Sequence, residues 1–382
     1  MKQRWEVKKL GEVCLISTGK SNTEDAVENG NYAFFDRSKI IKKSSKYLFD
    51  CDAIIVAGEG QTFLPKFYSG KFDLHQRAYA IFNFDKDVSV HYVYKYLIHF
   101  HKYFAEVAVG ATAKSLRLRH FQDLPIPIPS LHEQQRIVEI LDEVFDGIVK
   151  AKANAEQNLK NAQELFESYF QGIFENKSDK WKQDTLGAIL SEPPKNGWSP
   201  PAKYHSNTGT PVLTLSAVTG FIFKSNSIKY TSAHVKNEAT YWIKNGDLLI
   251  TRSNTPELVG HVAICQDLSE MTIYPDLMMK INPNESIVLT KFLYYQLKSP
   301  KLREIIMNSS HGANPTMKKI NKQDVQSFEI TYPSLPDQQT IVQKLDALSL
   351  ETKKLETIYR TKIADLEELK KSILHKAFNG EL

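Results

Sequence analysis

The chain has 382 residues, of which 42% are hydrophobic and 11% aromatic, enough to build the cores of two or three domains. It contains no run of about 18 apolar residues and no apolar stretch near its start, so we expect neither a membrane span nor a secretory signal. Its three cysteines form no Cys-x-x-Cys, so we expect neither a zinc site nor a disulfide framework. Its net charge is +5, and the positive charge is concentrated in two segments. Residues 1–130 have 19 Lys and Arg against 14 Asp and Glu, and residues 179–333 have 17 against 13. These excesses favour a polyanion partner, although excesses of this size also occur on ordinary surfaces.

Residues 1–129 are predicted to form a mixed α/β domain. Residues 52–57 (DAIIVA) have the apolar run of a buried strand, and residues 90–107 are predicted to be helical. Residues 124–129 (LPIPIP) close the domain as an extended segment, because proline disfavours a helical conformation in the residue before it and cannot donate to the middle of a sheet.

A long helix is predicted at residues 130–178. Ser130 and Glu133 fit a capping box at its start. Apolar residues then recur at alternating spacings of four and three, as in the seam of a coiled coil, at Ile137, Leu141, Val144, Ile148, Ala151 and Ala155. The seam continues one residue out of step at Leu159 and Ala162, and such a slip locally unwinds a supercoil.

The second half of the chain repeats the first. Residues 129–142 (PSLHEQQRIVEILD) and 333–346 (PSLPDQQTIVQKLD) share nine of fourteen positions at an offset of 204, which predicts a second domain at residues 179–333 and a second long helix at residues 334–382. The strand, the helix and the closing segment return at residues 247–251, 289–307 and 328–333. The second seam has the same spacings and slip, at Ile341, Leu345, Leu348, Thr352, Leu355, Tyr359, Ile363 and Leu366.

The shared seam and slip predict that the two long helices pack on each other, since two unrelated amphipathic helices would not share a slip. A helix of about 45 residues is about 67 Å long, whereas a domain of about 155 residues has a radius of gyration near 15 Å. The second domain cannot carry the chain back over that length, so the helices are expected to run antiparallel. The expected fold is α+β, with two mixed α/β domains joined by an antiparallel two-helix coiled coil and related by a pseudo-twofold repeat.

No complete catalytic or metal-binding motif is found. Thr18-Gly19-Lys20-Ser21 lacks the first glycine of a phosphate-binding loop, since Cys14 stands in its place, and Gly58-Glu59-Gly60 lacks the third glycine of a dinucleotide-binding turn. Glu192-Pro193-Pro194-Lys195 departs at both ends from the motif with which amino-methyltransferases hold their target base. We therefore expect no active site, no bound cofactor and no metal in this chain.

Basic and polar side chains gather in loops that follow the predicted strands and two Gly-Ala turns, at residues 110–111 and 312–313. Arg, Asn, Ser and Thr side chains read base edges in the major groove, and Lys side chains suit phosphates. The alternative is that these residues belong to solvated loops without a ligand. The candidates for DNA contact are Lys20, Arg77, Thr112, Lys114, Ser115, Arg117 and Arg119 in the first domain, and Arg252, Ser253, Asn254, Asn314, Thr316, Lys318 and Lys319 in the second.

The order of motifs resembles the specificity subunits of type I restriction-modification enzymes over nearly the whole chain. The motifs are Trp-x(4)-Leu-Gly-x-[Val/Ile] from Trp5 and Trp181, the Gly-Ala turns, and Pro-Ser-Leu-x-[Glu/Asp]-Gln-Gln-x-Ile-Val from Pro129 and Pro333. The resemblance implies two target-recognition domains, each reading one half of a bipartite site in double-stranded DNA, and helices that act as a ruler. Because the recognition domains are the variable part of this family, the resemblance assigns no base contact to a particular residue.

The resemblance also implies partners that carry the chemistry. Two methyltransferase subunits would bring S-adenosylmethionine, restriction endonuclease and translocase subunits would bring ATP and Mg²⁺, and the complex would act in the cytoplasm of a bacterium or archaeon. Gln134, Gln135, Gln338 and Gln339, at the helix starts, are expected to help dock partners. Two alternatives remain, a protein scaffold without a DNA role and a specificity subunit of a fused nuclease-methyltransferase.

Overall fold

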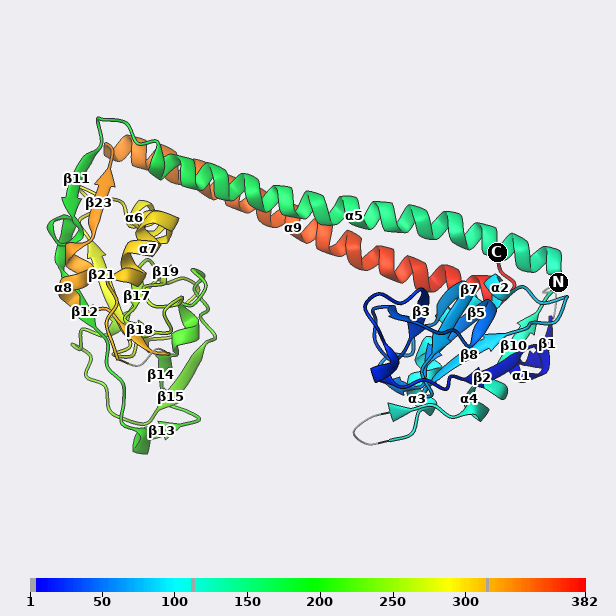
Figure 1. Ribbon diagram of the computed structural model, residues 1–382. Coiled ribbons are helices and arrows are strands. Elements are labelled where there is room, and N and C mark those ends of the chain that lie inside the picture. The colour runs from blue at the N-terminus through cyan, green and yellow to red at the C-terminus, as the bar shows by residue number, and fades with distance from the viewer. Residues whose placement is uncertain (1–4, 111–113, 314–315) are drawn as a thin grey trace. The chain divides into compact units, whose positions relative to one another are not determined.

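The computed structural model describes residues 5–110, 114–313 and 316–382, and the chain divides into two compact units. Unit 1 comprises residues 1–158 and 358–382, and unit 2 comprises residues 159–357. Each unit holds one globular domain, domain 1 or domain 2, together with part of both long helices (Figure 1). Both domains mix helices and strands, so the predicted α+β class is confirmed.

Domain 1 is built on a six-stranded sheet with the strand order β2-β8-β5-β7-β3-β4, in which only β3 and β7 are parallel neighbours. The strands are β2 (Leu15–Thr18), β8 (Ala78–Phe82), β5 (Phe49–Ala57), β7 (Lys66–Leu74), β3 (Tyr32–Phe35) and β4 (Lys42–Ser44). The strand predicted at residues 52–57 is part of β5. Ile54 and Val56 pack into one core, while Ala53 and Ile55 pack into another on the opposite face, which explains the unbroken apolar run.

Short helices and two short ladders complete domain 1. They are α1 (Leu10–Val13), the 3₁₀ turn Thr23–Asp25, α2 (Val90–His99), α3 (His101–Val107), α4 (Leu118–Gln122), β1 (Glu6–Lys9) paired with β10 (Pro125–Ile128), and β6 (Glu59–Gly60) paired with β9 (Lys114–Ser115). The single helix predicted at residues 90–107 breaks at Phe100, whose φ of −90° and ψ of 8° lie in the bridge region. Among the described residues, β10 pairs with β1 alone, which suits its prolines.

Domain 2 contains two larger sheets and two short ladders. The four-stranded sheet consists of β12 (Leu190–Asn196), β21 (Met278–Pro283), β17 (Leu248–Thr251) and β19 (Val262–Ile264), in that order. The five-stranded sheet consists of β13 (His205–Ser206), β15 (Ile228–Thr231), β14 (Thr210–Leu213), β20 (Thr272–Ile273) and β16 (Trp242–Ile243). The ladders pair β11 (Lys182–Thr185) with β23 (Glu329–Tyr332) and β18 (Ser253–Asn254) with β22 (Lys318–Lys319).

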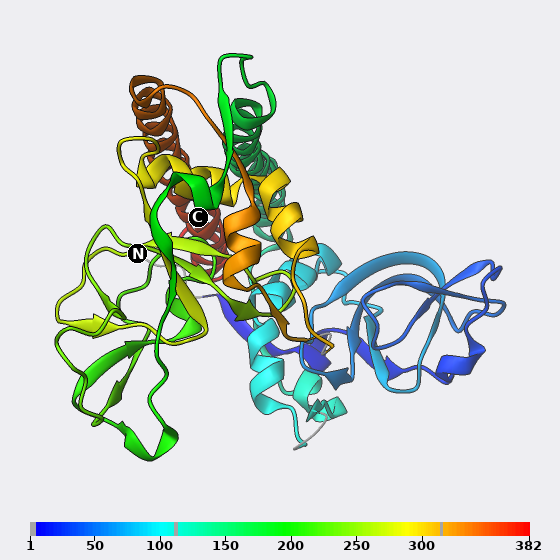
Figure 2. The same cartoon turned by 90° about the vertical axis from the view of Figure 1, so that its left-hand side faces the viewer.

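The helices of domain 2 follow the pattern of domain 1. They are α6 (Thr290–Lys298), α7 (Pro300–Asn308), α8 (Lys322–Ser327) and 3₁₀ turns at Leu186–Ile189, Ala202–Tyr204 and Leu215–Ala217. The single helix predicted at residues 289–307 breaks at Ser299, because Pro300 disfavours a helical residue before it and starts α7. The yellow helices of Figure 2 are α6 and α7, and the Tyr295 hydroxyl of α6 donates to Asp346 of the second long helix at 2.7 Å.

The two long helices are α5 (Leu131–Glu175) and α9 (Leu335–Phe378), and they pack side by side (Figure 1). In unit 1, Arg136 donates to the carbonyl oxygen of Leu382 at 2.9 Å, and Lys152 is ion-paired with Glu367 at 2.5 Å. Contacts made by later residues of α5 are therefore to earlier residues of α9, so the two helices run in opposite directions. The predicted antiparallel coiled coil is confirmed.

The predicted seam is correct along α5, where Ile137, Leu141, Ile148, Ala155 and Ala162 are buried. In α9 one position differs. Leu355 is 39% exposed, and the next residue, Glu356, accepts a hydrogen bond from Gln163 of α5 at 2.9 Å. The slip in α9 therefore follows the buried Thr352, earlier than the spacing predicts.

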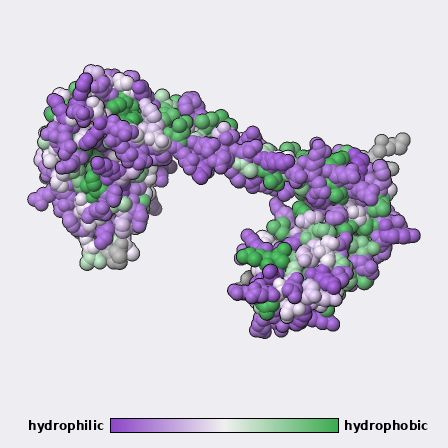
Figure 3. Space-filling view, turned by 45° about the horizontal axis from the view of Figure 1, so that its top comes forward, coloured by the Kyte–Doolittle hydropathy of each residue, from purple (hydrophilic) through white to green (hydrophobic). Residues whose placement is uncertain are grey.

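The cores of both domains include side chains of the long helices. In unit 1, the ring of Phe378 lies edge-on to those of Tyr92 and Tyr96, with centroids 5.5 and 5.1 Å apart. In unit 2, Phe170 and Leu345 belong to the core of domain 2. Burying a side chain of this size contributes about 1.5–3 kcal/mol. The face that Figure 3 shows is mainly hydrophilic. In the part of the chain that the structure describes, no helix is long and apolar enough to span a membrane.

Candidate nucleic-acid interface

Two short antiparallel ladders bring together the segments predicted to contact DNA. In domain 1, β6 pairs with β9 and places Glu59 opposite Ser115; we call this ladder ribbon 1. In domain 2, β18 pairs with β22 and places Ser253 opposite Lys319; we call this ladder ribbon 2. Each ribbon joins the loop after a buried strand to the segment after a glycine turn, so segments far apart in sequence form one surface.

The ribbons occupy equivalent places in the two domains. In domain 1, the backbone N–H of Gly58 donates to the carbonyl oxygen of Arg77 at 2.8 Å. In domain 2, the backbone N–H of Arg252 donates to the carbonyl oxygen of Leu277, also at 2.8 Å. Gly58 thus corresponds to Arg252, and Arg77 to Leu277. The backbone is conserved between the copies, whereas the side chains differ in size and charge.

Ribbon 1 carries an oriented ion pair. The Nη1 atom of Arg77 lies 2.8 Å and 3.0 Å from the two carboxylate oxygens of Glu59. The Arg77 side chain is 62% exposed and that of Glu59 only 18%. The backbone N–H of Arg77 donates to Nδ1 of His75 at 3.0 Å, and burial lowers the pKa of this imidazole. His75 therefore acts as a neutral acceptor at Nδ1 and keeps its proton on Nε2.

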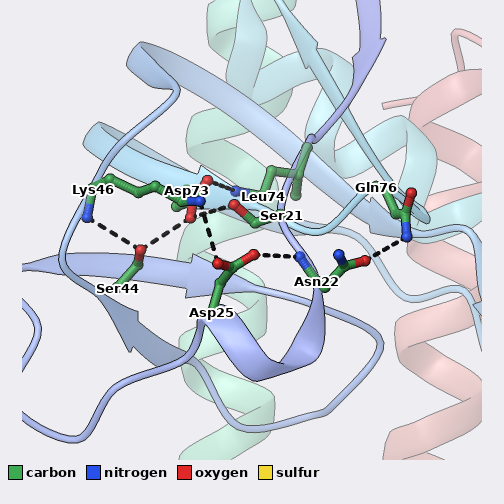
Figure 4. Close-up of polar contacts among 8 residues, drawn as sticks. All are labelled: Ser21, Asn22, Asp25, Ser44, Lys46, Asp73, Leu74 and Gln76. Carbon is green, nitrogen blue, oxygen red and sulfur yellow. Dashed lines mark hydrogen bonds and ion pairs between the residues drawn. The ribbon is translucent and has the colours of Figure 1, made fainter.

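A buried polar network holds the segment beside this ion pair (Figure 4). The carboxylate of Asp73 accepts hydrogen bonds from the hydroxyls of Ser21 at 2.7 Å and Ser44 at 3.0 Å. All three side chains are nearly inaccessible to water, so each bond that is lost would leave a buried polar group unpaired. Asn22, next to Ser21, accepts a hydrogen bond from the Gln76 side chain. The two exposed amides line the same surface depression as the guanidinium.

Of the other candidates of domain 1, Lys114 and Ser115 lie on ribbon 1, and Arg117 and Arg119 follow it closely in sequence. Lys114 is exposed and donates to the carbonyl oxygen of Ala105 at 2.6 Å, and Ser115 is half-buried. Arg117 immediately precedes α4, and Arg119 is in its first turn. Exposed side chains are those of Lys20, Arg117 and Arg119. Thr112 lies outside the described residues.

Ribbon 2 presents a different set of side chains. Arg252 is half-buried and donates to the carbonyl oxygen of Asp276 at 3.4 Å, while Asn254 lies opposite Lys318. Lys318 donates to the carbonyl oxygen of Gly312 at 2.8 Å. The remaining candidates are Lys319 and Thr316, which are exposed, and Asn314, which lies outside the described residues.

Ser253 does not fit its predicted DNA contact. The residue is 2% exposed, and its hydroxyl has no hydrogen-bond partner among the residues that the structure describes. The side chain faces the domain interior because its neighbours on the ribbon, Arg252 and Asn254, point outward in alternation. Ser253 therefore contributes the backbone of the ribbon rather than a side chain to its surface.

Gln134 and Gln338 are fully buried, which contradicts direct docking through their side chains. The Gln134 side chain accepts from the backbone N–H of Ser89 at 2.8 Å and donates to the carbonyl oxygens of Asp87 and Pro129, both at 2.9 Å. Gln338 makes the equivalent three bonds in domain 2. Each glutamine therefore fixes its domain to the start of a long helix.

Gln134→Ala is expected to lower the free energy of unfolding by roughly 1–3 kcal/mol, because buried backbone groups lose their partners. Gln135→Ala is the matched control, since Gln135 is exposed. Urea denaturation of both variants measures the difference. A Gln134→Ala midpoint equal to that of the unmodified chain would contradict the structural role.

Sequence reasoning missed the residues that orient Arg77. These are Glu59 and His75. The hydrogen bond between Asn22 and Gln76 was missed as well, and all of these contacts arise only when separate loops meet in the folded domain. The internal repeat is the signal that was available. When the loops that follow the two buried strands are aligned, Glu59 corresponds to Ser253. That comparison identifies a position on the ribbon, although it cannot indicate an ion pair.

The model of the type I restriction modification DNA specificity domain matches the chain twice, over residues 2–161 and 178–364. The chain belongs to this family. Each match covers one domain and much of the helix that follows it, as the internal repeat predicts. The specificity chain recognises DNA target sequences and is not the catalyst of its system, which favours the DNA-binding interpretation over a protein scaffold.

Known specificity subunits are similar to this specificity chain along much of their length. The type I restriction enzyme EcoDI specificity subunit of Escherichia coli is 24% identical over 408 residues, which cover 99% of this chain and 88% of that protein. The EcoKI specificity subunit of Escherichia coli strain K12 is 27% identical over 291 residues, which cover 73% of this chain and 62% of that protein.

Two solved structures share the fold of the specificity chain. One, from work on complex assembly and conformational transition of the type I R-M system, has a TM-score of 0.73 and 20% identity, and the match covers 99% of this chain and 98% of the other. The HsdS subunit from Thermoanaerobacter tengcongensis has a TM-score of 0.60 and 19% identity, with 99% and 97% covered. The predicted resemblance is confirmed in sequence and in fold.

Proposed function

We propose that the specificity chain reads a bipartite target in double-stranded DNA, with one half-site for each domain. The observation that carries this proposal is the pair of ribbons, which have the same backbone position in their domains but different side chains. Arg77 and Glu59 in domain 1 correspond to Leu277 and Ser253 in domain 2. Since different side chains select different base edges, we expect the two half-sites to differ in sequence.

Affinity and specificity are assigned to different residues of the ribbons. Lys114, Lys318 and Lys319 suit phosphates, which supply affinity that falls with salt but carry no sequence information. Arg77, Arg252 and Asn254 have side chains that can form paired hydrogen bonds to base edges.

The partners that the family resemblance implies are part of this proposal. Two methyltransferase subunits that bind S-adenosylmethionine, and restriction endonuclease and translocase subunits that use ATP and Mg²⁺, would assemble on this chain in the cytoplasm of a bacterium or archaeon. Gln135 and Gln339 are exposed at the starts of α5 and α9 and are the remaining docking candidates. The paired long helices would set the gap between the half-sites.

Selection from a random duplex library tests the proposed function. The full chain is purified with the methyltransferase subunit of its own system, and bound DNA is recovered and sequenced. Two short sequence blocks separated by a constant gap are expected among the recovered duplexes. Recovery of no common sequence would contradict DNA reading by this chain.

Arg252→Ala is expected to relax base choice in one half-site at a cost of roughly 1–3 kcal/mol, because a bidentate base contact is lost. Lys318→Ala is the contrasting variant on the same ribbon. It is expected to weaken binding to all sequences and to reduce the slope of log affinity against log salt by about one. Titrations of cognate and non-cognate duplexes at several salt concentrations separate the two effects. Equal losses on both duplexes for Arg252→Ala would place that residue on the phosphate backbone.

A further inference from the structure

A depression of about 290 Å³ lies beside ribbon 1. Its lining includes Asn22, Arg37, Glu59, His75, Gln76 and Arg77. All of these side chains are polar, and all but Glu59 and His75 are exposed. A polar, solvent-facing depression next to a ribbon expected to contact DNA is suited to one edge of a base.

The Arg77–Glu59 ion pair fixes the direction of the guanidinium in this depression. Glu59 is carried by β6, is mostly shielded from water and holds only the Nη1 atom of Arg77. A guanidinium has five N–H donors in a rigid plane, so the donors on its other nitrogens keep a defined direction. An oriented side chain also loses less conformational entropy when it binds.

The donors that line the depression, and the oriented Arg77 above all, favour guanine. Arg77, Arg37 and the Nε2–H of His75 are hydrogen-bond donors. In the major groove guanine presents two acceptors, O6 and N7, whereas adenine presents one acceptor and one donor, and cytosine presents a donor. A pair of parallel N–H groups from one arginine matches only the guanine edge.

A phosphate would be a poorer ligand at this place. Glu59 and Glu24 both line the depression, and their carboxylates repel a phosphate while Glu59 already offsets the charge of Arg77. The edge of guanine carries no net charge and does not meet this repulsion. Domain 2 has Ser253 and Leu277 at the equivalent positions, so the arrangement is particular to domain 1.

We propose that Arg77, positioned by Glu59, recognises a guanine in the half-site of domain 1, an inference that rests on the proposed DNA-reading function. Arg77 donates to O6 and N7 of that guanine. Glu59 is a positioning residue, because it acts on the base through the guanidinium.

Library selection with the full chain and its methyltransferase tests this proposal. The unmodified complex is expected to recover a guanine in the half-site that Arg252→Ala leaves unchanged. Arg77→Ala is expected to reduce the preference for that guanine roughly 5- to 150-fold, the range given by one bidentate contact, and to leave the other half-site intact. Replacing this guanine with 7-deazaguanine, which lacks the N7 acceptor, should weaken binding of the unmodified complex and have little effect on Arg77→Ala.

Glu59→Gln separates positioning from structural damage. This variant is expected to lower the preference for guanine while it strengthens binding to all DNA sequences, because a negative charge near the phosphates is removed. Structural damage would instead weaken both the preference for guanine and the binding to all DNA sequences. Lys9→Ala is the matched control, since Lys9 forms an exposed ion pair with Asp123 at 3.0 Å in the same unit, and it should leave the recovered sequence unchanged.

The outcomes distinguish this proposal from the function on which it rests. If the unmodified complex recovers no common sequence, the proposed function fails. If it recovers a bipartite sequence and Arg77→Ala recovers the same one with uniformly weaker binding, Arg77 contacts a phosphate and the guanine proposal is overturned. A recovered half-site for domain 1 that contains no guanine overturns it as well.

Discussion

Replacing residues 179–333 with the corresponding segment of a relative is expected to change one half of the recognised sequence and leave the other half unchanged. The physical reason is that each domain has its own core and its own ribbon. The hydrogen bonds that position each ribbon join residues of the same unit. These boundaries carry β11 and β23 together, so the ladder between them is transferred intact. Genome-wide mapping of methylated sites in cells that carry the chimaera measures the result.

The reciprocal exchange of residues 1–129 is the control for this prediction. It should change the other half of the sequence, and the gap should stay the same in both chimaeras because the long helices are retained. A chimaera that methylates DNA with both halves altered would contradict the assignment of one half-site to each domain.

The long helices were predictable from sequence because their signals are local and repeated. Alternating spacings of four and three persist over many turns, and both copies carry them. The exposure of Leu355, which departs from the predicted seam, has a physical reason as well. Gln163 and Glu356 can satisfy each other across the helices, so the packing shifts by one residue and leaves the leucine in solvent.

The ribbons were predictable only in part. The basic segment after each glycine turn is visible in the sequence, but the pairing of Glu59 with Ser115 joins residues 56 positions apart through a two-residue strand. Such a strand has no periodicity of its own, and its position depends on tertiary contacts. The burial of Gln134 is equally invisible, since a glutamine at the start of a helix is normally solvated.

The register of α5 and α9 provides the second test with a large expected effect. Lys152 pairs with Glu367 in unit 1, and Gln163 pairs with Glu356 in unit 2. Four residues added after Ala155 would turn the apolar stripe by about 40°, at about 100° per residue, and would place these two pairs four residues out of step. We expect the singly extended chain to lose thermal stability and no longer to support methylation of DNA by the complex that contains it.

Seven residues added to each helix, after Ala155 and after Tyr359, should restore the seam because seven residues complete nearly two turns. Both pairs keep their partners, since the two helices lengthen equally between them. Each helix becomes about 10 Å longer at 1.5 Å per residue, which corresponds to about three base pairs at 3.4 Å each. If the helices set the gap, the complex with the doubly extended chain should keep both half-site sequences and methylate sites with a longer gap, as mapping of methylated DNA would show. An active variant with an unchanged gap would mean that the partner subunits or the bending of DNA set the spacing.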